Sequence, residues 1–384
     1  MTVRIIGMSD YRYTPLDSLR GFIMVVMALD HANSFIAHGK RELELWYFLF
    51  PNYNGDNLAF LTRFVTHLAA PGFFFLMGAG MALFTLSRRA RNWTNRQIVS
   101  HFLLRGALLI LLQFLLENPA WDIGTDSSAL DYFGVLYALG GAMMIGSLLV
   151  LLPNTAVFPL SLLLILTTEA LLPAAPTTYA TFPTAQLLFY IPGFGDIFVP
   201  QTLVLYPILP WLGVMGLGLG YGRFLHQSPQ RTIQLPGYLA LAALLAFIPL
   251  RLLSPYGNIR PLPTNYDWIG FLNLVKYPPS LTFLLLTLGI NLLLLRLFFW
   301  LETQSPISSL QSPLPTFGRE PLFFYITHLY LYGVMGLWLN RAATPTIAHM
   351  YPYWLLGLVI LWPLCWAYGK WKNGRSPTSL WRFL

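Results

Sequence analysis

The sequence predicts an all-α membrane protein, a polytopic bundle of about ten transmembrane helices with both termini in the cytoplasm. Of the 384 residues, 56% are hydrophobic and only 10% are charged, whereas roughly 25% of an ordinary soluble domain is charged. Apolar runs of about 20 residues, the length of a helix that spans a bilayer, recur along the chain. Basic residues gather in alternate loops. This composition excludes a soluble enzyme, a disordered protein and a nucleic-acid-binding domain.

The predicted spans follow one another without a hydrophilic domain or linker, so residues 1–384 are expected to form a single membrane domain. The first span is not a cleavable signal peptide, because Asp17 and Arg20 lie inside it. The fifth span is short and residues 183–200 could be re-entrant, so nine or eleven spans are alternatives. The sixth contains GVMGLGLGYG (213–222), whose small residues favour close helix packing. The spans are centred on residues 16–37, 59–86, 98–116, 131–152, 156–172, 203–225, 233–252, 280–300, 321–340 and 353–371.

The charges of the loops predict the orientation. The loop after the second span carries four arginines, whereas the next loop carries three acidic residues and no Lys or Arg. By the positive-inside rule, residues 87–97 and both termini face the cytoplasm, and residues 117–130 face outward. This topology accounts for the net charge of +8 without a nucleic-acid partner. The expected location is the plasma (inner) membrane, with the lipid bilayer as partner and a homo-oligomer left open.

Ionisable residues inside the spans are the candidates for function, because burying each in lipid costs at least about 2.5 kcal/mol. In the first span Asp17, Arg20 and His31 share one helical face, and Asp30 lies beside it. An Asp17–Arg20 pair could equally serve only to anchor the helix. Asp30 and His31, an adjacent acid and imidazole, form a unit that titrates near neutral pH. In the second span Arg63 and His67 are four residues apart and therefore share a face.

Two later segments place charge at the ends of spans. Lys276 stands before a double proline at the outer mouth of the eighth span. Gly318 and Arg319 precede Pro321 at a cytoplasmic helix start, which suits a phosphate group; ordinary capping and anchoring at the membrane edge is the alternative. His328 follows two turns into that helix.

The candidate residues fall into two groups on opposite sides of the membrane. The outer group comprises Asp30, His31, Arg63, His67, Lys276 and Glu117, and the cytoplasmic rim comprises Arg88, Arg89, Arg91 and Arg319. No metal site is expected, because the histidines are scattered and Cys365 is the single cysteine. Such a protein could pass an anionic group from the inside to chemistry near the outside.

Five segments between residues 16 and 332 carry a family resemblance: LDSLRGFIMVVMALDHA, TRFVTHLAAPGFFFLMGAG, YPILPWLGVMGLGLGYG, FLNLVKYPPSLTFLLLTLG and FGREPLFFYITHLYL. Together they resemble the heparan-α-glucosaminide N-acetyltransferase-like family of membrane acyltransferases. The resemblance implies acyl transfer from cytosolic acetyl-CoA, as co-substrate, to a small-molecule or glycan hydroxyl or amine across the membrane. It also implies a central pore for the pantetheine arm.

The lysosomal members carry their proposed catalytic histidine at a position that falls near Asn57 in this sequence, where no His stands. His67 or His31 is therefore the expected general base, with His67 slightly favoured and a covalent acyl-histidine left open. Asp30 would orient the base. Substrate or oxyanion contacts are expected from Arg63, Lys276 and His328, and CoA phosphate contacts from Arg319, Gly318, Arg88, Arg89 and Arg20.

Two alternatives to an acyltransferase come from other classes of protein. One is a transporter or flippase for a small anionic or glycolipid substrate, since buried charges along a pore serve that role as well. The other is a structural membrane subunit, which would leave the histidines inside the spans unexplained.

Overall fold

The computed structural model describes residues 13–37, 44–48, 51–124, 132–176, 180–253, 255–304, 312–339 and 346–375. Most of these residues are helical. The helices are α1 (Thr14–Phe35), α2 (Asn57–Thr66), α3 (Ala69–Arg89), α4 (Asn95–Leu112), the π-helix η1 (Gln113–Glu117), α5 (Asn118–Trp121), α6 (Val135–Leu149), α7 (Asn154–Ala170), α8 (Thr184–Phe189), α9 (Ile208–Gln227), α10 (Pro229–Leu253), α11 (Trp268–Leu272), α12 (Leu281–Gln304), α13 (Pro313–Arg319), α14 (Pro321–Leu339) and α15 (Ile347–Asn373).

Seven helical stretches in the described part of the chain are long and apolar enough to cross a membrane: Asn57–Arg89, Asn95–Trp121, Ile208–Gln227, Pro229–Leu253, Leu281–Gln304, Pro321–Leu339 and Ile347–Asn373. The other three predicted runs correspond to α1, α6 and α7. Helix α1 carries Asp17, Arg20 and Asp30, which lower its hydropathy. Helices α6 and α7 have 15 and 17 residues, fewer than the roughly 20 that span a bilayer. The count of ten spans stays a prediction, as does the orientation of the termini, whose last residues lie outside the described ones.

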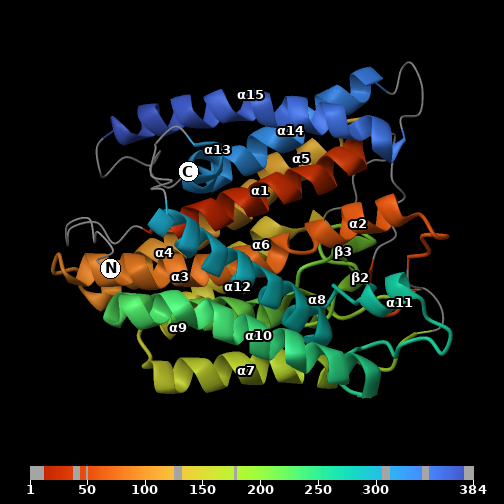
Figure 1. Cartoon of the computed structure of the whole chain (residues 1–384), viewed down its shortest axis with the longest axis horizontal. Coiled ribbons are helices and arrows are strands. Elements are labelled where there is room, and N and C mark those ends of the chain that lie inside the picture. The colour runs from red at the N-terminus through yellow and green to blue at the C-terminus, as the bar shows by residue number, and fades with distance from the viewer. Residues whose placement is uncertain are drawn as a thin grey trace.

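The long helices run side by side along one direction, with α7 at one edge of the bundle and α15 at the opposite edge (Figure 1). Helices α3 and α9 pack closely in the middle. A Cβ atom on Gly78 would lie 1.9 Å from the carbonyl oxygen of Met215, and one on Gly218 would lie 1.9 Å from that of Phe75. The close packing predicted for the small residues of the sixth run is therefore confirmed. This packing holds α3 against α9 at the centre of the bundle.

A small sheet at one end of the bundle departs from the all-α prediction. Its strands are β1 (Tyr132–Phe133), β2 (Gly193–Gly195) and β3 (Thr202–Val204). Strand β3 lies between the others, parallel to β1 and antiparallel to β2. Strands of two or three residues are too short to show an alternating pattern, so the sequence gives no signal for them. The chain leaves β3 toward Tyr206, which lines the site.

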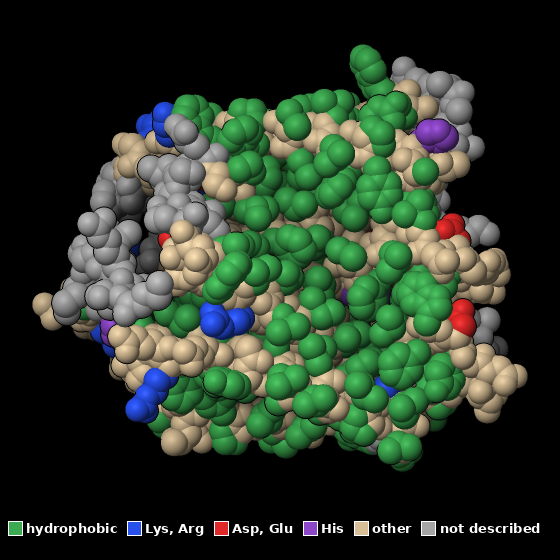
Figure 2. Space-filling view, viewed as in Figure 1, with side chains coloured by type: hydrophobic (Ala, Val, Ile, Leu, Met, Phe, Trp, Pro, Cys, Tyr) green, Lys and Arg blue, Asp and Glu red, His purple; other side chains and the backbone are tan. Residues whose placement is uncertain are grey.

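The two ends of the bundle differ in charge. Figure 2 shows a broad apolar band between them, with most of the visible Lys and Arg side chains toward the left end and the visible acidic ones mainly toward the right. The left end holds the end of α3 with Arg88 and Arg89. The right end holds α2, α11 and the sheet (Figure 1). This arrangement matches a membrane-embedded band with a basic side and an acidic side.

Candidate functional site

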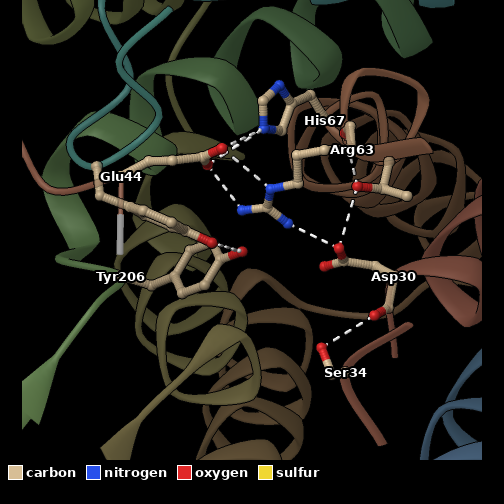
Figure 3. Close-up of polar contacts among 8 residues, drawn as sticks. Asp30, Ser34, Glu44, Arg63, His67 and Tyr206 are labelled. Carbon is tan, nitrogen blue, oxygen red and sulfur yellow. Dashed lines mark hydrogen bonds and ion pairs between the residues drawn. The ribbon is translucent and has the colours of Figure 1, made fainter. Parts of the chain in front are cut away.

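Arg63 on α2 is the centre of a buried ionic cluster. Its Nε and Nη2 donate to the two oxygens of Glu44 at 3.0 and 2.7 Å, and its Nη1 donates to Asp30 Oδ1 at 2.7 Å. Figure 3 shows the guanidinium between the two carboxylates. Thr66 also donates to Asp30 Oδ1, at 3.2 Å. Three of the five N–H donors of the guanidinium, one on each of its nitrogens, are therefore used on these two carboxylates. Arg63 thus ties α1, α2 and the Glu44 segment together.

His67 lies at a break between α2 and α3. A proline at position 71 has no N–H to donate to the carbonyl of residue 67, so the helix is interrupted there. His67 Nε2 lies 3.0 and 3.1 Å from the Glu44 oxygens. Because ionised carboxylate oxygens only accept, this nitrogen donates. The nitrogen of His67 that faces the cluster is therefore not the one that could take a proton.

Glu44 was not expected from the sequence. Burial would raise the pKa of its carboxyl, but Arg63 and His67 beside it hold that pKa well below its usual range. Glu44 is therefore a carboxylate at every working pH. It lies between two predicted spans in the stretch RELELW, which reads as an ordinary polar loop. No periodicity marks one glutamate of this stretch as buried.

His31 on α1 pairs with His328 on α14. Its Nδ1 lies 2.6 Å from His328 Nε2, and the two rings stack with centroids 4.9 Å apart. His328 is fully buried, and its Nδ1 lies 2.9 Å from the Phe324 carbonyl oxygen. Trp121 presents an edge to the His31 ring at 4.9 Å. The structure therefore joins two histidines that are 297 residues apart in the sequence.

A cavity of about 40 Å³ opens between these groups. That volume holds a few water molecules, so a substrate must widen it. Five residues of the predicted outer group differ in their relation to the cavity. Asp30, His31 and Lys276 line it, whereas Arg63 and His67 do not. The remaining lining residues are Met27, Thr66, Ala69, Ala70, Phe73, Val135, Tyr206 and Tyr325.

Lys276 supplies the positive charge of the cavity wall. It is 3% exposed, and its ammonium lies 5.0 Å from the centre of the Tyr277 ring. Burial and the Arg63 charge lower the pKa of Lys276 to about 8, against the opposing effect of Asp30 and Glu44. Tyr277 in turn meets Tyr206 at 3.0 Å, hydroxyl to hydroxyl. Among the described residues, no carboxylate lies within 4.0 Å of the Lys276 ammonium.

Glu117, the last residue of η1, is 1% exposed. Its carboxyl lies within electrostatic range of Tyr325, which lines the cavity. Tyr330 donates to the Leu116 carbonyl at 3.1 Å and so satisfies a backbone group of the π-helix. The π-helix thus carries Glu117 behind the cavity wall, and such single π-turns are frequent at functional sites.

Three of the residues predicted to face the cytoplasm form a second cluster where α1 meets α13. Arg20 donates to Asp17 and to the Gly318 carbonyl, both at 2.9 Å, and Arg319 Nε lies 3.7 Å from Asp17. A Cβ on Gly318 would lie 1.9 Å from the Asp17 carbonyl oxygen, so only glycine permits this approach. The structure therefore brings Arg20, Gly318 and Arg319 together.

Two further arginines of the predicted cytoplasmic rim make contacts at the end of α3. Arg88 lies over the rings of Phe84 and Trp93 at 4.8 and 4.9 Å, and Arg89 donates to Asn95 at 3.2 Å. Arg105 on α4, which the sequence analysis did not single out, lies within electrostatic range of Arg20. The sequence could have indicated Arg105, because it is a charged residue inside an apolar run.

Helix α1 carries residues of both clusters. Comparison with known proteins identifies the family of the chain. The family described as heparan-alpha-glucosaminide N-acetyltransferase, catalytic, matches residues 12–257. The chain belongs to this family. Its members are membrane acetyltransferase-like proteins, so the chain belongs among the transferases. A search of curated proteins found no match.

The heparan-alpha-glucosaminide N-acetyltransferase match includes α1, α2 and the Arg63 cluster. Lys276, Arg319 and His328 lie beyond its last residue, so only their geometry ties them to the site. Asn57, at the position expected for the catalytic histidine of lysosomal members, is the exposed first residue of α2. Among the described residues, no group of three or more His, Cys, Asp or Glu could hold a metal ion.

Proposed function

We propose that this chain transfers an acetyl group from cytosolic acetyl-CoA to a hydroxyl or amine of a sugar or glycoconjugate on the outer side of the membrane. The observation that carries the proposal is the cavity in which an imidazole, a carboxylate and an ammonium meet. Family membership supplies the reaction class. The proposal includes ten spans, with both termini in the cytoplasm, in the plasma (inner) membrane.

His31 is the proposed general base. It lines the cavity, whereas His67 does not and has its Nε2 committed to Glu44. Asp30, fixed by Arg63 and Thr66, adds negative charge beside the imidazolium that forms. The acceptor oxygen or nitrogen attacks the thioester carbonyl, and its proton passes to His31. The new bond forms to the acetyl carbon, the C–S bond breaks, and CoA leaves as a thiolate that takes a proton from water.

Lys276 is the proposed partner of the oxyanion. Arg63, the other candidate, already uses its Nε, Nη1 and Nη2 on Glu44 and Asp30. The Lys276 ammonium lines the cavity and faces no carboxylate among the described residues at ion-pair distance. A buried cation of this kind is worth most against charge that develops only in the transition state.

The donor's phosphates are assigned to the cytoplasmic arginines. Arg20 and His31 are 11 residues apart on α1, which corresponds to roughly 16 Å along the helix axis. An extended pantetheine arm would have to bridge that distance from Arg20 and Arg319 to the cavity. Arg105, Arg88 and Arg89 add positive charge at the same end of the bundle and are part of the same proposal.

The test is acetyl transfer across a bilayer. Purified protein in liposomes receives labelled acetyl-CoA on one side and glucosamine, or a glycolipid that ends in glucosamine, on the other. Label should appear in the acceptor. His31→Ala should slow transfer by about 10²–10⁴-fold, the usual contribution of a general base. The matched control is His349→Ala in the first turn of α15, where the imidazole contacts Thr346 at 2.9 Å and does not line the cavity.

Two results would contradict the proposal. Transfer by His31→Ala at the wild-type rate would remove this imidazole from the chemistry. Uptake of labelled donor or acceptor by the liposomes without any acetylated product would show a transporter instead.

A further inference from the structure

We propose that His328 is a positioning residue that fixes the tautomer of His31, so that Nε2 of His31 is its basic nitrogen. The catalytic consequence rests on the proposed function, but the tautomer itself is a property of the resting protein. The backbone carbonyl of Phe324, which can only accept a hydrogen bond, sets the orientation of both histidines.

A carbonyl oxygen only accepts hydrogen bonds. His328 Nδ1 lies 2.9 Å from the Phe324 carbonyl oxygen, one turn earlier on α14, so this nitrogen carries a hydrogen. A neutral imidazole has one N–H and one lone pair. In neutral His328 the lone pair is therefore on Nε2. The ring is fully buried, and α14 holds it in this orientation.

The lone pair on Nε2 of His328 in turn determines which nitrogen of His31 carries a hydrogen. His31 Nδ1 lies 2.6 Å from His328 Nε2. Two lone pairs at that distance would repel, so His31 Nδ1 must carry the hydrogen that is shared. Neutral His31 then has its lone pair on Nε2. In a histidine, the hydrogen bond made by one ring nitrogen decides which nitrogen is protonated.

The ring contacts prevent an easy exchange of the two nitrogens. The His31 and His328 rings stack with an interplanar angle of 16°, and Trp121 and Tyr325 meet the His31 ring edge-on at 85° and 84°. A flip of His31 would break the 2.6 Å contact. When His31 gains a proton during transfer, its Nδ1–H bond to His328 becomes charge-assisted and stronger. A neutral imidazole thus takes the place that a carboxylate has in other acid–base triads.

The experiment is nitrogen NMR of the full-length protein, labelled with ¹⁵N in histidine and kept mildly alkaline, with the His31 signals assigned by their loss in His31→Ala. Wild type should show a protonated Nδ1 and an unprotonated Nε2 for His31. His328→Met removes a good acceptor and should shift His31 toward the Nε2–H form. His328→Gln has the same chain length, and its amide oxygen can accept, so the Nδ1–H form should persist.

Acetyl transfer should follow the tautomer. His328→Met should lose about 10²-fold or more, the lower end of the contribution of a general base, and His328→Gln should recover most of that loss. Tyr332→Phe is the control on α14, because it removes a different buried hydrogen bond, the one to the Trp354 carbonyl. It should leave both the His31 spectrum and the rate unchanged.

An Nε2–H signal for His31 in the wild type would overturn the inference, and so would an unchanged His31 tautomer in His328→Met. The wild-type spectrum decides even if His328→Met does not fold. If no variant transfers acetyl groups but the wild-type tautomer is Nδ1–H, the proposed function fails and the positioning inference stands.

Discussion

The positive charge of Lys276 lowers the stability of the folded protein but is required for the proposed activity. Its side chain is buried in the cavity wall and costs folding energy when charged, yet the proposed chemistry needs the charge. Arg63, which lies beside the same cavity, raises that cost because it carries a like charge. Asp30 and Glu44 reduce it. The result is an ammonium that loses its proton near pH 8 rather than near 10.5.

This pKa predicts opposite pH trends. Between about 8 and 10.5 the unfolded chain binds more protons at this residue than the folded one, so stability should rise with pH in that window. Acetyl transfer should fall over the same window as the ammonium is lost. Lys276→Arg keeps its charge and should remove the alkaline fall in rate. The checks are pH–rate profiles and thermal unfolding of both proteins, with Lys276→Met as the variant that lacks the stability gain.

A rate that falls equally in wild type and in Lys276→Arg would assign the alkaline limb to another group. Glu44 is not a candidate, because the pKa of its carboxyl is already far below this range.

At the residue scale, the sequence identified which side chains to watch but not how they pair. The cost of burying charge in a span singled out Asp30, His31 and Arg63. In the structure Asp30 pairs with Arg63 and lines the cavity together with His31. The choice between His31 and His67 depended on partners that the sequence does not show. His67 is bound by Glu44, 23 residues away, and His31 by His328, 297 residues away. Such contacts arise from packing, and no local pattern encodes them.

At the scale of the elements, helix α3 makes two contrasting demands on its glycines. Gly78 faces α9, and a Cβ there would meet the Met215 carbonyl oxygen at 1.9 Å. Gly80, two residues later on the same helix, has nothing within 4 Å of its Cβ position. Substitutions at the two positions therefore distinguish the effect of close packing from the intrinsic helix propensity of glycine. In a helix, glycine is about 1 kcal/mol less favourable than alanine.

Gly78→Ala should destabilise the protein by about 1–3 kcal/mol, because the helices must move apart and backbone atoms cannot yield. Gly80→Ala should be neutral or stabilising by up to about 1 kcal/mol. Reversible unfolding in detergent measures both. Equal destabilisation by the two variants would mean that α3 and α9 are not in the contact described.

The elements themselves were largely predictable. Each apolar run corresponds to a helix, because the period and length of such runs are set by the bilayer. Two details were not. The second run is interrupted between Thr66 and Ala69 by the backbone effect of a proline, and the fourth helix continues through a π-helix that ends at Glu117. The first irregularity adjoins the cavity and the second places Glu117 behind its wall, so functional geometry overrides the regular pattern here.

At the scale of the whole molecule, the proposed reaction requires that the two clusters face different compartments. The start of α1 and helix α13, which carry Arg20 and Arg319, lie toward the basic end of the bundle, and α2, which carries Arg63, lies toward the end with the sheet (Figure 1). The apolar band seen in Figure 2 separates these ends. The charge of the loops predicts which end of the bundle is cytoplasmic. Because loop charge only favours one orientation of the chain in the membrane, the topology must be measured directly.

Cysteine labelling provides that measurement. In a Cys365→Ala background, Arg91→Cys at the basic end should react with an impermeant maleimide only after the cells are opened, because basic loops stay in the cytoplasm. Asn57→Cys at the other end should react in intact cells. Both positions are exposed, so a difference in labelling reports the compartment and not burial. Labelling of both from the same side would place acetyl donor and acceptor in one compartment, and transfer across the membrane would then be impossible even with His31, Lys276 and the cavity arranged as described.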